Sequence, residues 1–128
     1  MINFKKVRFW RRVYLSFSIF LGIFAPLYCW YTFPEYNPFS DPLSDFGIEE
    51  STWIMWDFTL CISAISIFLN SKHAIKHRFK KKFTILFLRS LVIISSICLI
   101  LVAIISIDTD ESLHYWLAFL YFSVYNFF

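Results

Sequence analysis

The most constraining feature of this sequence is a series of long apolar segments separated by loops of opposite charge. One uncharged run extends over 18 residues, from Ser90 to Ile107. Four apolar segments cover residues 13–33, 52–70, 84–107 and 113–128. About 20 apolar residues in a helix are enough to cross the hydrocarbon core of a bilayer. We therefore expect an all-α fold, a polytopic transmembrane helical bundle with four spans, in which residues 1–128 form a single domain.

The composition excludes an ordinary soluble domain. Apolar residues make up 59% of the chain and charged residues only 16%, whereas soluble domains are about half apolar and a quarter charged. The apolar segments are continuous, and a membrane barrel would instead alternate apolar and polar residues along each strand. The composition thus predicts helices in contact with lipid.

The charged residues are divided between the predicted loops by sign. The residues before the first span and the loop 71–83 hold all the Lys and Arg residues except Arg89, while the loops 34–51 and 108–112 hold all the acids except Asp57. Lys and Arg in short loops are retained on the cytoplasmic side. We therefore expect a multi-pass protein of the cell membrane with a cytoplasmic N-terminus and basic loop, and with extracytoplasmic acidic loops. Aromatic residues expected at the outer interface are Trp30, Tyr31, Trp53, Trp56, Tyr115 and Trp116.

The first acidic loop contains prolines spaced four residues apart and one glycine. Pro34, Pro38 and Pro42 disfavour a regular helix, and Gly47 can take the positive φ needed to turn into the second span. This pattern predicts either a structured lid over the outer end of the bundle or a solvated acidic loop.

Acidic residues also mark the expected starts of two helices. Asp108 and Glu111 have the spacing of a capping box before the fourth span. Residues 49–51, with the sequence Glu-Glu-Ser, precede the second span in the same way. Both signals favour helices that begin at the acidic side.

Asp57 lies about five residues inside the second span, where an acid is costly unless it faces the bundle interior. His114, at the outer start of the fourth span, is the expected partner. With Asp45, and with Asp110 as a further candidate, they can form a carboxylate and imidazole cluster that does acid/base work or holds a cation. The alternative is an Asp–His hydrogen bond that only joins two helices.

The basic loop is a candidate site for anionic lipid, because Lys and Arg beside a span attract acidic headgroups. Its basic residues are Lys72, Lys76, Arg78, Lys80, Lys81 and Lys82. The alternative is that these residues only determine the topology. Arg89 is expected to extend towards the inner headgroups, and a nucleic-acid partner is not indicated because the basic patch lies against the membrane.

No metal site or cofactor is expected. His73 and His77 are four residues apart, but no third ligand is near them in the sequence. Each of Cys29, Cys61 and Cys98 falls in a different predicted span, so their spacing indicates neither a disulfide framework nor a metal site.

Two strings resemble a known pattern of membrane proteins. SDPLSDFG and LHYWLAFLYF are similar to the Leu-Ser-(Asp)-x-Gly loop and the downstream His-x-x-x-Ala-x-x-x-Phe helix of the domain-of-unknown-function 998 family and its FRAG, DRAM and Sfk kin. The matching residues are Leu43, Ser44, Asp45, Gly47, His114, Ala118 and Phe122. The resemblance implies a polytopic helical protein with a lipid-related role. Because members usually have about six spans, it also implies a truncated or minimal member.

Three functions are compatible with the sequence. The first is a non-enzymatic accessory subunit of a larger membrane complex, or a self-associating protein, because no convergent catalytic set is visible. The second is an outer-leaflet lipid-handling enzyme or lipid binder that uses Asp45, Asp57 and His114. The third is a small immunity-type membrane protein, by analogy of size and composition alone.

Overall fold

The computed structural model describes residues 4–125, and the side chains of residues 4–7, Lys72 and Tyr125 lie outside the description. Its elements in chain order are α1 (Phe4–Thr32), the short 3-10 helix η1 (Leu43–Gly47), α2 (Trp53–Arg78), α3 (Lys82–Ile104) and α4 (Glu111–Tyr125). Over the described residues the fold is all-helical, as the apolar pattern predicts.

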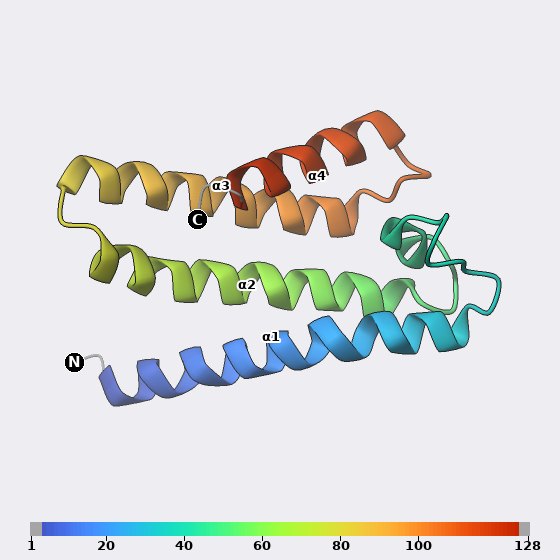
Figure 1. The fold of residues 1–128 in the computed structure, drawn as a ribbon, viewed down its shortest axis with the longest axis horizontal. Coiled ribbons are helices and arrows are strands. Elements are labelled where there is room, and N and C mark those ends of the chain that lie inside the picture. The colour runs from blue at the N-terminus through green and yellow to red at the C-terminus, as the bar shows by residue number, and fades with distance from the viewer. Residues whose placement is uncertain (1–3, 126–128) are drawn as a thin grey trace.

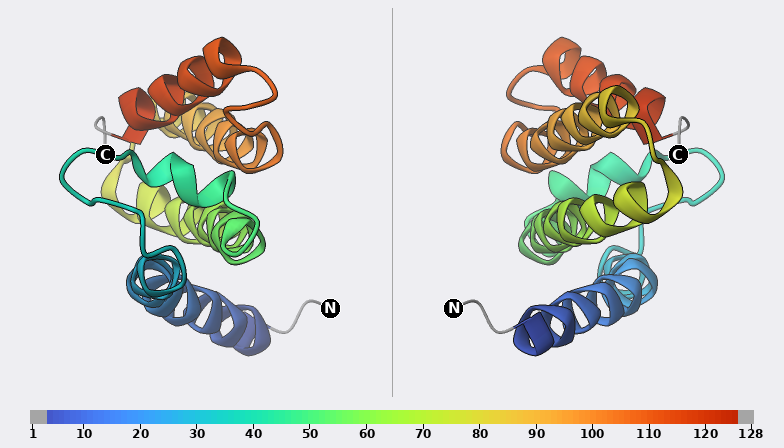
Figure 2. Two further views of the ribbon diagram at one scale, coloured as in Figure 1. Left: turned by 90° about the vertical axis from the view of Figure 1, so that its right-hand side faces the viewer. Right: turned by 90° about the vertical axis from the view of Figure 1, so that its left-hand side faces the viewer.

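The four long helices are stacked in chain order. α1 packs on α2, α2 on α3 and α3 on α4, and η1 packs on the start of α2. Figure 1 shows α1, α2 and α3 running back and forth along the molecule, and the end-on views of Figure 2 show them stacked one above the other. α4 returns beside α3 and stops partway along it. α2 therefore lies between α1 and α3, with η1 across its first turns.

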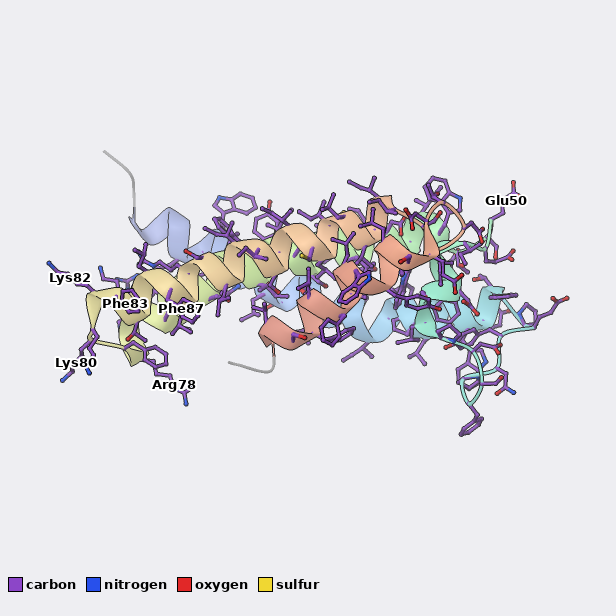
Figure 3. The ribbon with its side chains drawn as sticks, turned by 90° about the horizontal axis from the view of Figure 1, so that it is seen from above. Glu50, Arg78, Lys80, Lys82, Phe83 and Phe87 are labelled. Carbon is purple, nitrogen blue, oxygen red and sulfur yellow. The ribbon has the colours of Figure 1, made fainter. Side chains whose placement is uncertain are left out.

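The two ends of the bundle carry opposite charges. One end, here called the acidic end, holds the loop 33–52 with η1 and the turn 105–110. The other, here called the basic end, holds the turn 79–81 between α2 and α3. In Figure 3, Arg78, Lys80 and Lys82 lie at the basic end and Glu50 lies at the opposite end.

Three helices are long and apolar enough to cross a membrane. They cover residues 8–32, 53–78 and 82–104. Only 17% of the most apolar stretch of α1 is buried inside the protein, and 28% of that of α3. Most of their apolar surface therefore faces outwards and needs an apolar solvent. With 15 described residues, α4 is about 22 Å long, shorter than a typical span.

The helix boundaries differ from the sequence-based expectation at the basic end. α2 continues to Arg78, so most of the expected basic loop 71–83 is helical and Lys72, Lys76 and Arg78 belong to the helix. Phe79 is in an extended conformation and ends α2. Residues 71–78 contain neither Gly nor Pro, and nothing in them interrupts the helix. The chain therefore reverses within three residues.

The helix starts at the acidic end are also formed differently from the prediction. The backbone N–H of Leu113 donates to Oδ1 of Asp110 at 2.9 Å, so Asp110, and not Asp108, caps α4. At the start of α2, the Thr52 side chain makes no capping bond. Its hydroxyl donates instead to the carbonyl oxygen of Phe46 at 2.7 Å and ties η1 to α2. The tertiary contact thus replaces the local cap.

The loop at the acidic end has a small core of its own. Phe46 is 1% exposed and packs against Tyr36 and the fully buried Cys29. The rings of Phe46 and Trp56 meet edge to face with their centroids 5.5 Å apart. Trp56 is therefore a packing residue of this loop, whereas the sequence places it in the outer aromatic belt. The loop is structured, which agrees with the lid interpretation.

Candidate functional site

A cavity of about 560 Å³ opens beneath η1 at the acidic end, and we call it the acidic-end cavity. η1, α2, α3 and α4 all contribute to its wall. Its polar side chains are Ser44, Asp57, Ser63, Ser106, His114, Tyr115 and Tyr121. The rest of the wall is largely apolar, with Leu60, Leu99 and Phe122 among its residues. The cavity thus combines an apolar body with a few polar groups, as ligand sites do.

His114 is 6% exposed, and one of its ring nitrogens is engaged by the protein. Its Nδ1 lies 2.7 Å from the carbonyl oxygen of Ile105, at the end of α3. A carbonyl oxygen only accepts, so Nδ1 carries the proton and donates. In the neutral ring Nε2 is then an acceptor. His114 therefore joins α4 to α3 and leaves one nitrogen for a ligand.

Asp57 lines the same cavity from the second turn of α2. Its carboxylate is close enough to His114 to interact with it electrostatically. Among the described residues, however, no hydrogen bond links the two side chains, because the His114 ring bonds to Ile105. The predicted direct Asp–His bond is thus not formed, although both residues face one cavity.

Gly47 lies directly over Asp57 and Trp56. A Cβ added to Gly47 would lie 3.3 Å from Cδ1 of Trp56 and 3.6 Å from Oδ1 of Asp57. None of the described glycines has a positive φ, so the expected left-handed turn at Gly47 is wrong. The backbone of η1 thus packs closely on α2 and leaves little room for a side chain at this position.

Asp45, the third predicted site residue, is not part of the cavity wall. Partial burial and the nearby charges of Asp41 and Asp108 raise the pKa of its carboxyl group. Asp41 behaves in the opposite way, because the backbone N–H of Asn37 and the hydroxyl of Ser40 hydrogen-bond to its carboxylate and lower its pKa. Asp45 thus belongs to the acidic surface of the loop, apart from Asp57 and His114.

The remaining candidates lie at the basic end. Nε2 of His73 and Nε2 of His77 are 3.2 Å apart on the exposed side of α2. Within the described part of the chain, no group of three or more His, Cys, Asp or Glu side chains could hold a metal ion. Nε of Arg89 is buried beside Phe68 and Ile93 and has no hydrogen-bond partner among the described residues. The Lys72 side chain lies outside the described residues.

Several residues of the site have no signal in the sequence that could have revealed them. Thr52 reads as an ordinary helix start, yet it is 1% exposed and holds η1 in place. Ser63 and Ser106 are isolated serines in apolar surroundings, and only the packing brings them to the cavity. A hydroxyl in a span is by itself too common to indicate a site.

The apolar helices and the amphipathic cavity define a helical membrane protein. The family model described as "Protein of unknown function (DUF998)" matches residues 17–124, and the chain belongs to this family. The expected resemblance to this family is thereby confirmed, while the link to the FRAG, DRAM and Sfk proteins stays an expectation. Neither the search of curated proteins nor the search of solved structures gives a match.

Proposed function

We propose that this protein binds a phospholipid with an amine headgroup in the outer leaflet, through the acidic-end cavity. The observation that carries the proposal is that Asp57 and His114 line one cavity with apolar walls. The carboxylate oxygens of Asp57 and the free Nε2 of His114 are acceptors, so the matching ligand carries hydrogen-bond donors. An ethanolamine ammonium group meets this requirement and also carries the charge opposite to that of Asp57.

The walls and the surface around the cavity favour a lipid over a small water-soluble amine. Leu43 and Phe122, which line the cavity, are 52% and 62% exposed. Acyl chains can lie against these side chains while the headgroup reaches Asp57. The acidic surface formed by Asp41, Asp45 and Asp108 would disfavour headgroups with a net negative charge.

The proposal includes a membrane topology. Four spans, with α4 as the short fourth one, place the N-terminus and the basic end in the cytoplasm and the acidic end outside. The segregation of charge supports this orientation, because Lys and Arg are retained on the inner side. Arg78, Lys80 and Lys82 at the basic end then face the anionic lipids of the inner leaflet (Figure 3). An impermeant maleimide should label a Ser40→Cys variant on intact cells and leave a Lys80→Cys variant unlabelled.

Lipid binding can be tested with purified protein in detergent. Dioleoyl-phosphatidylethanolamine should raise the Tm of the parent protein more than dioleoyl-phosphatidylglycerol does. Asp57→Asn should remove this difference, since the neutral amide no longer attracts the ammonium group. Glu50→Gln is the matched control, because Glu50 is an exposed acid at the same end that is not part of the cavity wall. Equal Tm shifts for the two lipids in the parent protein would contradict the proposal.

A second candidate function is the accessory subunit of a larger membrane complex. The exposed rings of Phe20, Phe24 and Tyr28 stack along one face of α1, with centroid distances of 5.4 Å and 5.9 Å. α1 has its main contacts with α2 alone, so this face is open to a further helix. Chemical crosslinking from Phe24→Cys in native membranes tests this second function. A discrete crosslinked product with another protein is expected. Labelling of the cysteine by a lipid-soluble reagent without any crosslinked product would contradict the accessory-subunit role.

A further inference from the structure

A second cavity, of about 710 Å³, lies between the middle of the bundle and the basic end. We call it the basic-end cavity. Residues of all four long helices line it. Its wall includes the hydroxyl groups of Ser18, Ser63, Ser66 and Ser95, the amide of Asn70, and Arg78 at the basic end. The wall thus brings four hydroxyl groups, one amide and one guanidinium group to a single cavity, and these groups can hydrogen-bond a polar occupant.

Several polar groups of the basic-end cavity bond within the protein. Nδ2 of Asn70 donates to the carbonyl oxygen of Ser66 at 2.9 Å, and the hydroxyl of Ser18 is 3.4 Å from that of Ser63. Ser95 lines the same cavity and is 2% exposed. A hydroxyl group both donates and accepts, so these serines are able to hydrogen-bond a polar occupant.

The two cavities adjoin in the middle of the bundle and share part of their walls. Ser63 of α2 and Tyr121 of α4 are part of both walls. Ser63 is ten residues after Trp53, which places it about 15 Å along the helix axis, close to the midplane of a core about 30 Å thick. Polar groups therefore follow α2 from Asp57 at one end to Arg78 at the other.

Exposed apolar side chains also line both cavities. Leu15 and Ile19 of α1 line the basic-end cavity and are 42% and 57% exposed. Leu43 and Phe122 are their counterparts at the acidic-end cavity. An amphipathic molecule can therefore keep its acyl chains in lipid while its headgroup stays among the polar side chains. Water or a proton would need no such apolar lining.

From this geometry we infer that the two cavities form one headgroup path, along which the protein lets a zwitterionic phospholipid pass between the leaflets. The ammonium group meets Asp57 and His114 at the acidic end, and the phosphate meets Arg78 at the basic end. The hydroxyls of Ser63, Ser66 and Ser95 replace water in between. The choice of headgroup rests on the proposed lipid binding at Asp57, whereas the path itself rests on the shared wall.

The test is a lipid-exchange assay in vesicles that contain the full chain. Phosphatidylethanolamine labelled with a fluorophore on one acyl chain is quenched from outside by dithionite. Quenching should exceed half of the fluorescence in vesicles with the parent protein and stop at half in protein-free vesicles. Ser63→Leu should slow the exchange at least about fivefold, because it fills the shared wall and removes one hydroxyl partner. Ser63→Thr, which keeps the hydroxyl, should retain the exchange.

Ser90→Leu is the matched control. Ser90 lies on the exposed side of α3, is part of neither wall, and donates its hydroxyl to the carbonyl oxygen of Leu86. This variant should exchange lipid like the parent protein. Equal rates for Ser63→Leu and the parent protein would overturn the path, since exchange would then come from general bilayer disturbance. Proton leakage without lipid exchange would also overturn it and indicate a water path.

The assay separates the path from the proposed binding site. If phosphatidylethanolamine stabilises the parent protein but no exchange occurs, the path is refuted and the binding site stands. If exchange occurs and is blocked by Ser63→Leu while Asp57→Asn leaves lipid stabilisation unchanged, the path stands without the proposed headgroup site. Thermal unfolding in detergent shows whether Ser63→Leu is folded. If it is not, Ser66→Val is the second variant that should slow the exchange, at a position outside the wall of the acidic-end cavity.

Discussion

Gly47 lies directly over Asp57 and Trp56: a methyl group on the glycine would lie 3.6 Å from Oδ1 of the carboxylate and 3.3 Å from Cδ1 of the indole ring. Gly47 belongs to η1, in the loop outside the helices, and all three residues line the acidic-end cavity. The loop thus packs closely on the residues of the site.

Gly47→Ala should lower the free energy of unfolding by about 1 kcal/mol, because its Cβ would lie 3.3 Å from Cδ1 of Trp56 and the ring would have to shift. Thermal or denaturant unfolding in detergent measures the change. Gly22→Ala is the control, since no atom lies within 4 Å of a Cβ added there. The same loss in both variants would argue against the close approach.

Thr52→Val should destabilise the protein by about 1 kcal/mol or somewhat more. The variant keeps the shape of the side chain but leaves the buried carbonyl oxygen of Phe46 without its 2.7 Å donor. Hydrogen exchange should show faster opening of residues 43–52 than in the parent protein. Ser51→Ala, at the exposed neighbouring position, should have little effect on either measurement.

His114→Ala and His114→Asn should separate the two roles of the histidine. Alanine loses the 2.7 Å bond to Ile105 and should cost about 1–3 kcal/mol, because a buried acceptor is left unpaired. In His114→Asn the side-chain amide can replace Nδ1 as donor to the carbonyl oxygen of Ile105, so the free energy of unfolding should be close to that of the parent protein. The rise in Tm caused by phosphatidylethanolamine should still be absent, because Nε2 is missing. Full lipid stabilisation in His114→Asn would mean that Nε2 does not contact the ligand.

Asp45→Asn should stabilise the protein near neutral pH and have little effect in acid. The folded state raises the pKa of Asp45 above its unfolded value, so the folded state binds the proton more tightly. Its contribution to stability is therefore present at low pH and lost as pH rises through the folded pKa. Tm measured against pH should show a smaller decline for the variant than for the parent. Asp41→Asn should destabilise the protein near neutral pH, since the folded state lowers the pKa of Asp41 and so favours its charged form.

Arg89→Met should be tolerated, with a change in the free energy of unfolding below about 1 kcal/mol. Nε of Arg89 is buried and has no partner in the described part of the chain, so the substitution breaks no hydrogen bond of Nε there and relieves the desolvation of the charge. Leu88→Ala, at the adjacent buried position, should cost about 2–5 kcal/mol and shows that the assay detects a packing defect. A loss of similar size in Arg89→Met would reveal an ion partner.

The sequence by itself determined the helical class, the segregation of charge and the end of the bundle at which each candidate residue lies. Hydropathy and helical period are properties of neighbouring residues, so they can be read without the fold. Successive helices run in opposite directions, so α2 and α4 both begin at the acidic end. Asp57 and His114 lie near the starts of these two helices and therefore at the same end of the bundle.

Only the tertiary structure decided which side chains meet at that end. His114 bonds to Ile105 instead of Asp57, Asp45 lies outside the cavity wall, and Gly47 allows close packing instead of a left-handed turn. The wall that the two cavities share at Ser63 likewise depends on how α2 and α4 pack. These contacts join segments far apart in the chain, and their geometry is set by packing across helices, which no local pattern encodes.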